Sequence, residues 1–275
     1  MKKLLFLALL ALVYATMARA ADSSATCAEA LGVSRVAEID TTGGGLFGEQ
    51  YPPQPLLQKG EVVLTFDDGP HPVHTKEILA ALAAQCAKAT FFNVGEMVKQ
   101  FPDVAREVQA QGHTVGTHTW SHPNLASLSL EGAKTQIEST ISAEEKVLPN
   151  GVAPFFRFPY LSDPKRVREY LAGRNIAVFS IDVDSFDYRT KSPDKIVDNV
   201  LMGLIKTGGG IILFHDIHER TAKALPTVLA EIKSHGFRVV HLVAKSRVEA
   251  IALAEPPTKA APQRRSRRHR RVARR

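Results

Sequence analysis

Two histidines and two aspartates of the sequence have the types and spacing of a metal-dependent hydrolytic site. His118 and His122 are four residues apart, so their rings would point the same way if the segment forms one helical turn. Asp67 and Asp68 are adjacent, and neighbouring carboxylates repel each other unless a cation or a proton neutralises one of them. Two histidines with one carboxylate can hold a transition metal and leave positions open for water and substrate. The pattern predicts that one aspartate binds a metal with the histidines while the other acts as a base.

A surface turn is the simpler interpretation of the segment that contains the two aspartates. Asp68, Gly69 and Pro70 are favourable turn residues. A surface turn does not explain why the apolar run 62–66 leads directly to Asp67 and Asp68. The functional interpretation accounts for both features.

Further polar residues follow other apolar runs of the chain. They are Arg157, Tyr160, Asp182, Asp184, Asp187, His215 and Asp216. Active sites of parallel barrels are built at the C-terminal ends of the strands, where such residues would meet. Their convergence is stronger evidence for one shared site than any single motif.

The apolar runs alternate with stretches of helical periodicity, which indicates parallel βα units. The runs are 62–66, 89–94, 113–117, 155–158, 176–181, 210–214 and 237–242, and the helical stretches are 74–87, 98–111, 130–147, 164–173, 193–206 and 221–235. The region 61–243 is short for the roughly 250 residues of an eight-unit barrel. We predict an α/β fold, a distorted seven-unit TIM-like barrel, (β/α)7, with an open doubly wound sheet as the alternative.

The two ends of the chain differ in composition from this region. Residues 1–20 combine two lysines, an apolar run and small residues before a cleavage site, which predicts a signal peptide and a periplasmic or secreted protein. Residues 21–60 contain consecutive glycines and several prolines, so we expect an N-terminal extension without regular elements. Residues 256–275 are rich in arginine and lack apolar periodicity, so we expect a disordered basic tail.

The formal charge of +7 comes from these two ends. Of the 35 lysines and arginines, three precede residue 21 and nine follow residue 258, which leaves 23 against 28 acidic residues, a charge of −5. Residues 21–258 therefore have no excess of basic side chains to neutralise phosphates, which argues against a nucleic-acid partner. The tail could contact anionic envelope polymers or a membrane surface, or it could be solvated without a partner.

Cys27 and Cys86 are the two cysteines of the sequence. Export would place both in an oxidising compartment, which predicts one disulfide between the N-terminal extension and the body. Neither cysteine has polar neighbours in the sequence that suggest catalysis.

Five ordered motifs of this sequence resemble those of the polysaccharide deacetylases, the NodB-homology enzymes grouped as carbohydrate esterase family 4. The motifs are T-F-D-D-G-P-H-P, H-T-W-S-H-P, F-R-F-P-Y, D-S-F-D-Y and I-L-F-H-D. The match covers residues 61–243, essentially the whole globular region. The resemblance implies a NodB-homology catalytic domain over these residues.

The resemblance also implies a division of roles among the five motifs. It assigns Asp68, His118 and His122 to the metal site and Asp67 to the role of general base. Arg157 would position Asp67, the backbone N–H of Tyr160 would help form the oxyanion hole, and His215 would be the general acid, oriented by Asp187 or by the alternative Asp184.

Three residues are candidates for contacts with the substrate in addition to Tyr160. The resemblance implies that Tyr188 and Leu213 line a pocket for the acetyl methyl group, although the family usually has tryptophan where this chain has Tyr188. Trp120 lies between the two metal histidines and could stack on a sugar face or pack in the core.

The function implied by the resemblance is removal of N-acetyl groups from a glycan that contains N-acetylglucosamine, of the peptidoglycan or chitooligosaccharide type. The cofactor would be a divalent cation, zinc first and cobalt or another transition metal second. Removal of O-acetyl esters, as on xylan, oxygenase chemistry on iron and non-catalytic glycan binding are the alternatives. We expect the protein to act as a monomer.

Overall fold

The computed structural model of the protein describes residues 27 and 29–251. The predicted signal peptide over 1–20 and the predicted basic tail over 256–275 lie outside the described residues. Within the described part of the chain, no helix is both long enough and apolar enough to cross a membrane.

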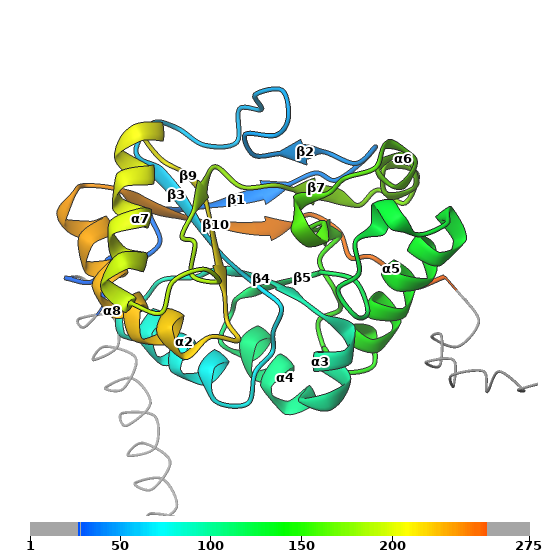
Figure 1. Ribbon diagram of the computed structural model, residues 1–275, viewed down its shortest axis with the longest axis horizontal. Helices are drawn as coiled ribbons and strands as arrows, with labels where there is room; N and C mark the ends of the chain where they lie inside the picture. The colour runs from blue at the N-terminus through cyan, green and yellow to red at the C-terminus, as the bar shows by residue number, and fades with distance from the viewer. Residues whose placement is uncertain (1–26, 28, 252–275) are drawn as a thin grey trace, which may run out of the picture.

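Over the described residues, ten strands form one sheet in which the strand pairs are parallel (Figure 1). Its main strands are β3 (Glu61–Asp67), β4 (Thr90–Asn93), β5 (Thr114–Thr117), β6 (Phe155–Phe156), β7 (Ala177–Phe179), β8 (Val183–Asp184), β9 (Gly210–His215) and β10 (Arg238–Ala244). Each of the seven predicted apolar runs contains a strand, and β8 is an addition. The predicted α/β barrel class is confirmed.

The barrel is distorted at two places in its ring of strands. β7 pairs with β6, whereas β8 pairs with β9, so the chain changes partners over residues 180–182 and joins the two sides of the ring. β9 pairs directly with β3, from Val62–Gly210 to Asp67–His215. β10 is therefore not inserted between these strands; it pairs with β3 only at Glu61 and Val62.

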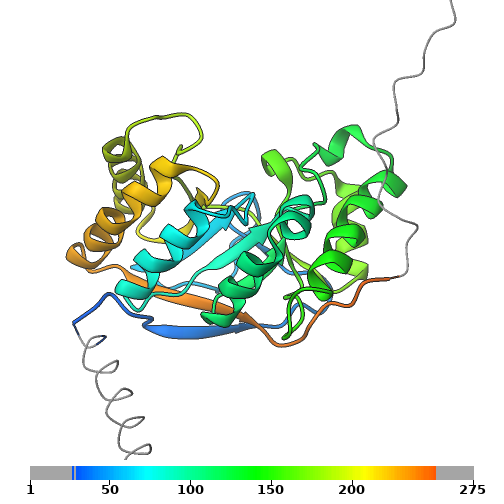
Figure 2. The same ribbon diagram turned by 90° about the horizontal axis from the view of Figure 1, so that it is seen from below.

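The prediction that residues 21–60 contain no regular element is wrong. β1 (Arg35–Ile39) pairs with β10, and β2 (Leu46–Phe47) pairs with β7. Figures 1 and 2 show β1 and β10 running side by side along the sheet. Ala37 and Ile39 are buried against apolar side chains of β10, which stabilises β1. The glycines and prolines separate these strands rather than prevent them.

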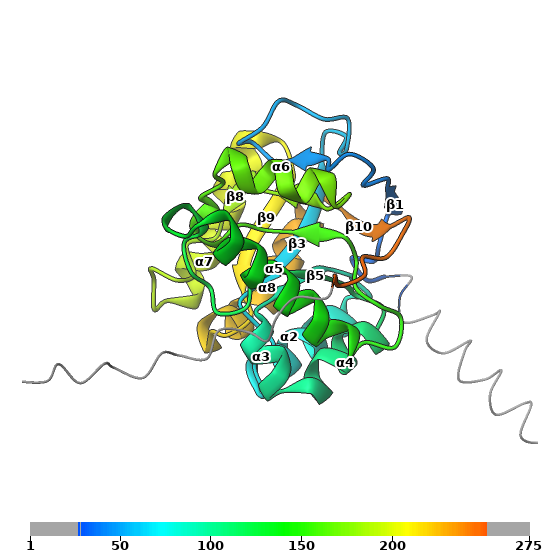
Figure 3. The same ribbon diagram turned by 90° about the vertical axis from the view of Figure 1, so that its right-hand side faces the viewer.

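Helices of the described chain cover the strands on several sides and leave β1 and β10 without a covering helix, as the view from the side shows (Figure 3). They are α2 (His74–Ala84), α3 (Gly95–Gln100), α4 (Pro102–Ala110), α5 (Leu130–Glu145), α6 (Lys165–Gly173), α7 (Pro193–Thr207) and α8 (Glu219–Ser234). All six predicted helical stretches contain a helix. The stretch 98–111 is divided because Pro102 begins a new helix, where its missing N–H is tolerated.

Side chains along β3 alternate between two environments. Val62, Leu64 and Phe66 belong to the large apolar cluster that includes the helices. Val63 belongs to a second cluster, and by strand alternation Thr65 and Asp67 point to the same side as Val63. The last residue of β3 therefore presents a carboxylate inside the ring.

The predicted disulfide between Cys27 and Cys86 is present, with a distance of 5.7 Å between the Cα atoms. It closes a loop with a sequence separation of 59 residues. Crosslinks of this loop size stabilise a fold by up to about 4 kcal/mol through the entropy of the unfolded chain.

Replacing both cysteines by serine is expected to lower the free energy of unfolding by about 2–4 kcal/mol. The rate of catalysis should change little, because neither cysteine lines the cleft described below. Denaturant unfolding of the wild type and the double variant measures the loss. Two free thiols in denatured, unreduced wild-type protein would contradict the crosslink.

Candidate active site

A cleft of about 390 Å³ lies at the C-terminal ends of the strands. It is lined by Asp67, Asp68, His118, His122, Phe158, Tyr160, Leu161, Asp184, Tyr188, Arg189, Leu213 and His215. The predicted metal ligands, base, acid and two methyl-pocket residues all reach this one cleft. Convergence at the strand ends is thus observed.

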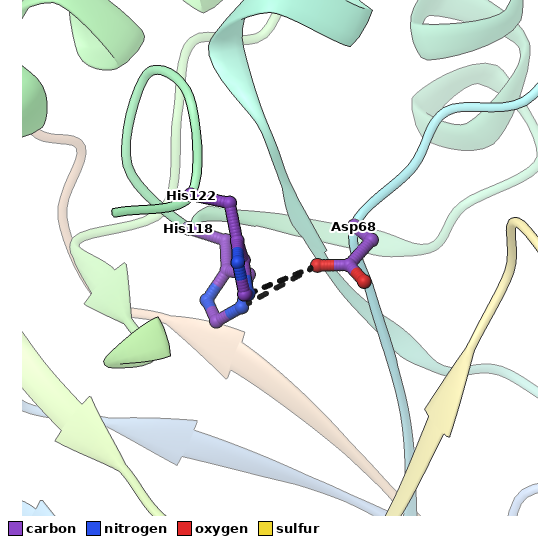
Figure 4. A group of neighbouring side chains, drawn as sticks. All are labelled: Asp68, His118 and His122. Atoms are coloured by element: carbon purple, nitrogen blue, oxygen red, sulfur yellow. Dashed lines mark ion pairs between the residues drawn. The ribbon is translucent and has the colours of Figure 1, made fainter. Parts of the chain in front are cut away.

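Asp68, His118 and His122 converge on one point (Figure 4). An Oδ1 atom of Asp68 lies 3.6 Å from Nε2 of His118 and 3.4 Å from Nε2 of His122. The histidines do not share a helical turn, so that part of the prediction is wrong. They lie in a loop after β5 in which His122 has a φ of 56° and Thr119 a φ of 67°. These left-handed residues fold the loop back and bring the two rings together.

The donor atoms of this group fit a divalent cation. Nδ1 of His118 lies 2.7 Å from the carbonyl oxygen of Arg157, which can only accept, so Nδ1 carries the hydrogen and Nε2 is free to ligate. Burial lowers the pKa of His118 to about 3, which keeps its ring neutral. Oδ1 of Asp68 is buried without a hydrogen-bond partner in the described part of the chain. Two nitrogen ligands and one carboxylate suit zinc and leave positions open.

Asp67 is buried and held by Arg157. Nη1 of Arg157 donates to Oδ1 of Asp67 at 2.8 Å and to the hydroxyl of Thr65 at 2.7 Å. The guanidinium also donates to two backbone carbonyls and lies 4.4 Å from the ring centroid of Phe92. Burial raises the pKa of Asp67 above its ordinary value, and the charge of Arg157 opposes this rise. The predicted contact between these two residues is confirmed, and it fixes the carboxylate in the cleft.

His215 is paired with Asp187, which decides between the two predicted aspartates. Nδ1 of His215 donates to Oδ1 of Asp187 at 2.7 Å, and the backbone N–H of His215 donates to Oδ2. Burial alone would lower the pKa of His215, because it disfavours the charged ring. The hydrogen bond and the charge of Asp187 outweigh this effect and raise the pKa to about 9. The alternative, Asp184, instead accepts from the hydroxyl of Tyr188 and the N–H of Phe186.

Tyr160, Tyr188 and Leu213 line the cleft as predicted. Tyr160 has a φ of 59°, and its ring lies against the ring of His122 at a centroid distance of 4.7 Å. The ring of Tyr188 lies 5.5 Å from the ring of His215. The roles of the Tyr160 N–H and of the methyl pocket remain predictions, since they concern a bound substrate.

The assignment of Trp120 to the substrate is corrected by the structure. Trp120 does not line the cleft, and its side chain is buried with 9% of the residue exposed. A Cβ atom placed on Gly95 at the start of α3 would lie 2.6 Å from Cε3 of this ring. The indole therefore packs against α3, which was the alternative stated for it.

The sequence pattern did not single out Arg189, whereas Asp216 was among the polar residues expected after the apolar runs. Arg189 lines the cleft directly after Tyr188. Asp216 follows His215 and is buried; Thr75 donates to its Oδ2 at 2.5 Å, and a Cβ on Gly69 would lie 2.0 Å from the same atom. Asp216 thus supports the turn that carries Asp68. The position of Arg189 directly after Tyr188, in the motif D-S-F-D-Y, was the signal that could have identified it.

Replacing Asp187 by asparagine is expected to move the alkaline limb of the pH profile of kcat to lower pH. Asp187 raises the pKa of His215, so the protonated acid persists to higher pH in the wild type. Without that charge His215 loses its proton earlier as the pH rises. A pH profile of kcat for both proteins measures the shift, and an unchanged alkaline limb would contradict the role of Asp187.

The chain is similar to known proteins in sequence and in structure. The model of the family "Polysaccharide deacetylase" matches residues 56–178. A peptidoglycan-N-acetylglucosamine deacetylase of Bacillus cereus is 35% identical over 191 residues, 67% of each chain. A chitooligosaccharide deacetylase of Azorhizobium caulinodans is 32% identical over 158 residues, 58% of this chain and 74% of that protein.

Among solved structures, the Bdellovibrio bacteriovorus peptidoglycan deacetylase Bd3279 superposes with a TM-score of 0.71 at 33% identity. The alignment covers 78% of this chain and 60% of that one, so this chain spans somewhat less than two thirds of the solved relative.

Proposed function

Since this chain belongs to the polysaccharide deacetylase family, we propose that it is a metal-dependent hydrolase that removes N-acetyl groups from glycans containing N-acetylglucosamine. The observation that carries the proposal is one cleft that brings together three candidate metal ligands, the buried carboxylate of Asp67 and the ring of His215. A glycan-binding module would need neither the Asp67–Arg157 pair nor the His215–Asp187 pair.

Asp68, His118 and His122 would hold the cation. When bound, a divalent cation polarises the acetyl carbonyl and makes a water proton more acidic. Asp67 takes that proton from the attacking water, and its raised pKa makes it a better base than an ordinary aspartate. Arg157 keeps the carboxylate of Asp67 oriented, because its guanidinium is itself fixed by four buried hydrogen bonds, one of them to Asp67.

His215 gives a proton to the departing amine, since its raised pKa keeps the ring protonated near neutral pH. Asp187 holds the ring through Nδ1, which leaves Nε2 as the donating atom. The N–H of Tyr160 would stabilise the tetrahedral oxyanion, a contribution of typically about 3 kcal/mol. Tyr188 and Leu213 would enclose the methyl group.

The substrate is proposed to be of the peptidoglycan or chitooligosaccharide type, because relatives with both names match this chain. Ester hydrolysis on an O-acetylated glycan is the second candidate, since the same base and acid could serve it. Oxygenase chemistry is less well supported, because it has no need of a base and an acid in these positions.

Acetate release from a panel of defined glycans tests the proposal. The panel contains N-acetylglucosamine oligomers, peptidoglycan fragments and O-acetylated xylan. We expect release from the first two and little from xylan. Release from xylan alone would replace the amide assignment by an esterase, and binding without release would favour a glycan-binding module.

We also propose that the protein is exported, on the basis of residues 1–20. The Cys27–Cys86 disulfide supports this proposal, because such crosslinks persist in oxidising compartments. N-terminal sequencing of protein recovered outside the cytoplasm should begin at Ala21. Recovery only of the full-length chain from the cytoplasm would refute it.

A further inference from the structure

Arg189 lines the cleft, yet the catalytic roles do not use it. Its guanidinium carbon lies 5.2 Å from the ring centroid of Tyr188 and 5.5 Å from that of Phe186. Over residues 27 and 29–251, no carboxylate lies within 4.0 Å of its nitrogen atoms. The side chain is exposed. Its planar array of donors is therefore available to a ligand.

The other charged residues in the cleft wall already have partners or roles. Asp67 is bound by Arg157, and Asp68 belongs to the metal group. Asp184 accepts from the hydroxyl of Tyr188 at 3.0 Å and from the N–H of Phe186 at 2.7 Å. Among the residues that the structure describes, Arg189 is the one lysine or arginine in the lining of this cleft.

The loop that carries Arg189 is fixed by its own hydrogen bonds. The N–H of Arg189 donates to the carbonyl oxygen of Phe186 at 2.9 Å, and Asn199 of α7 donates to the carbonyl oxygen of Ser185 at 3.0 Å. Buried Asp187 ties the same loop to His215. A charged side chain such as Arg189, carried on a loop that is ordered before binding, loses less conformational entropy when it binds its ligand.

The position of Arg189 indicates where its ligand group would lie. Tyr188 precedes it, and the ring of Tyr188 lies 5.5 Å from that of the proposed acid His215. A group bound by Arg189 would therefore sit close to the reacting acetamide, on the same sugar chain. Guanidinium forks match carboxylate oxygens in pairs.

We propose that Arg189 determines specificity for an acetylated glycan that carries a carboxylate next to the acetylated sugar, over a neutral chain of N-acetylglucosamine. This inference rests on the proposed deacetylase function. The lactyl ether of a muramic acid unit supplies such a carboxylate once its peptide has been removed, because the peptide otherwise holds that carboxyl group as an amide. A chitooligosaccharide has none. Arg189 thus favours a glycan of the peptidoglycan class from which the peptides have been removed.

A cycle of two enzymes and two substrates tests the pairing. The substrates are a peptidoglycan-derived oligosaccharide freed of its peptides and the same oligosaccharide with its carboxylates reduced to alcohols. The enzymes are the wild type and Arg189→Gln. Lys191→Gln is the matched control, because it removes one exposed charge from the same loop outside the cleft lining.

We expect reduction of the substrate to lower kcat/KM of the wild type about tenfold, a typical effect of losing a charge-assisted hydrogen bond. The Arg189→Gln variant should no longer distinguish the two substrates, and Lys191→Gln should distinguish them as the wild type does. Raising the ionic strength should weaken the preference of the wild type.

Equal kcat/KM of the wild type on both substrates would overturn the role of Arg189, and so would an unchanged preference in Arg189→Gln. Acetate release from either substrate would still uphold the deacetylase function in those cases. Absence of release from every glycan, with metal bound, would instead refute the proposed function and the inference together.

Discussion

Chelation of divalent cations is expected to abolish acetate release, and zinc, with cobalt second, should restore it. The reason lies in two atoms of the cleft: the free Nε2 of His118 and Oδ1 of Asp68, which is buried without a hydrogen-bond partner among the described residues. Nitrogen ligands with one carboxylate favour such metals over magnesium or calcium. Metal content and acetate release, measured on the same samples, give the result.

A matched pair of variants controls for loss of a histidine in general. His122→Gln should lose metal and activity together, because His122 belongs to the ligand group. His74→Gln removes a histidine that pairs with Glu77 outside the cleft lining, and it should retain both. Full activity of a verified metal-free protein would remove the basis of the proposed metal site.

Replacing Asp67 by asparagine is expected to lower kcat by about 10²–10⁴-fold, the range typical of a lost general base. The amide keeps the shape and can still accept from Arg157, but it cannot take a proton. Metal content should stay near that of the wild type, because the ligand group is Asp68, His118 and His122. Rate and metal stoichiometry of the purified variant are measured together.

Asp68→Asn is the matching variant one residue along the chain. It should lose metal, and excess metal should partly restore its rate, because an amide oxygen is a weaker ligand than a carboxylate. If Asp67→Asn were the variant that lost metal, the roles of the two aspartates would be exchanged. If neither variant changed the rate, the hydrolytic assignment would fail.

The candidate site was predictable from sequence where its chemistry lies within a few residues of a strand end. Asp67 ends β3 and Asp68 follows it directly, and His215 ends β9. Hydrophobic runs locate those ends, so the residues after them can be expected to meet. The barrel class is predictable from the same apolar runs, because each run needs only local apolar residues to be recognised.

The remaining features depend on contacts that no local pattern contains. The choice of Asp187 over Asp184 requires the position of His215, which is 28 residues away from Asp187 along the chain. Trp120 was assigned to the substrate because it lies between two ligands, but the bend at Thr119 directs it toward α3. The strand β1 was missed because its partner, β10, lies at the other end of the fold.

The pairing of β1 with β10 also constrains the order in which the protein can fold. Arg35 is in register with Val240 and Ile39 with Ala244, so the ladder joins residues about 205 positions apart. Closing so large a loop is entropically costly, and contacts of this range form slowly. During synthesis β1 therefore cannot pair with β10 until almost the whole described chain has emerged from the ribosome. The β1–β10 ladder joins both ends of the described fold, and it can form only after the segments that carry the cleft have been made.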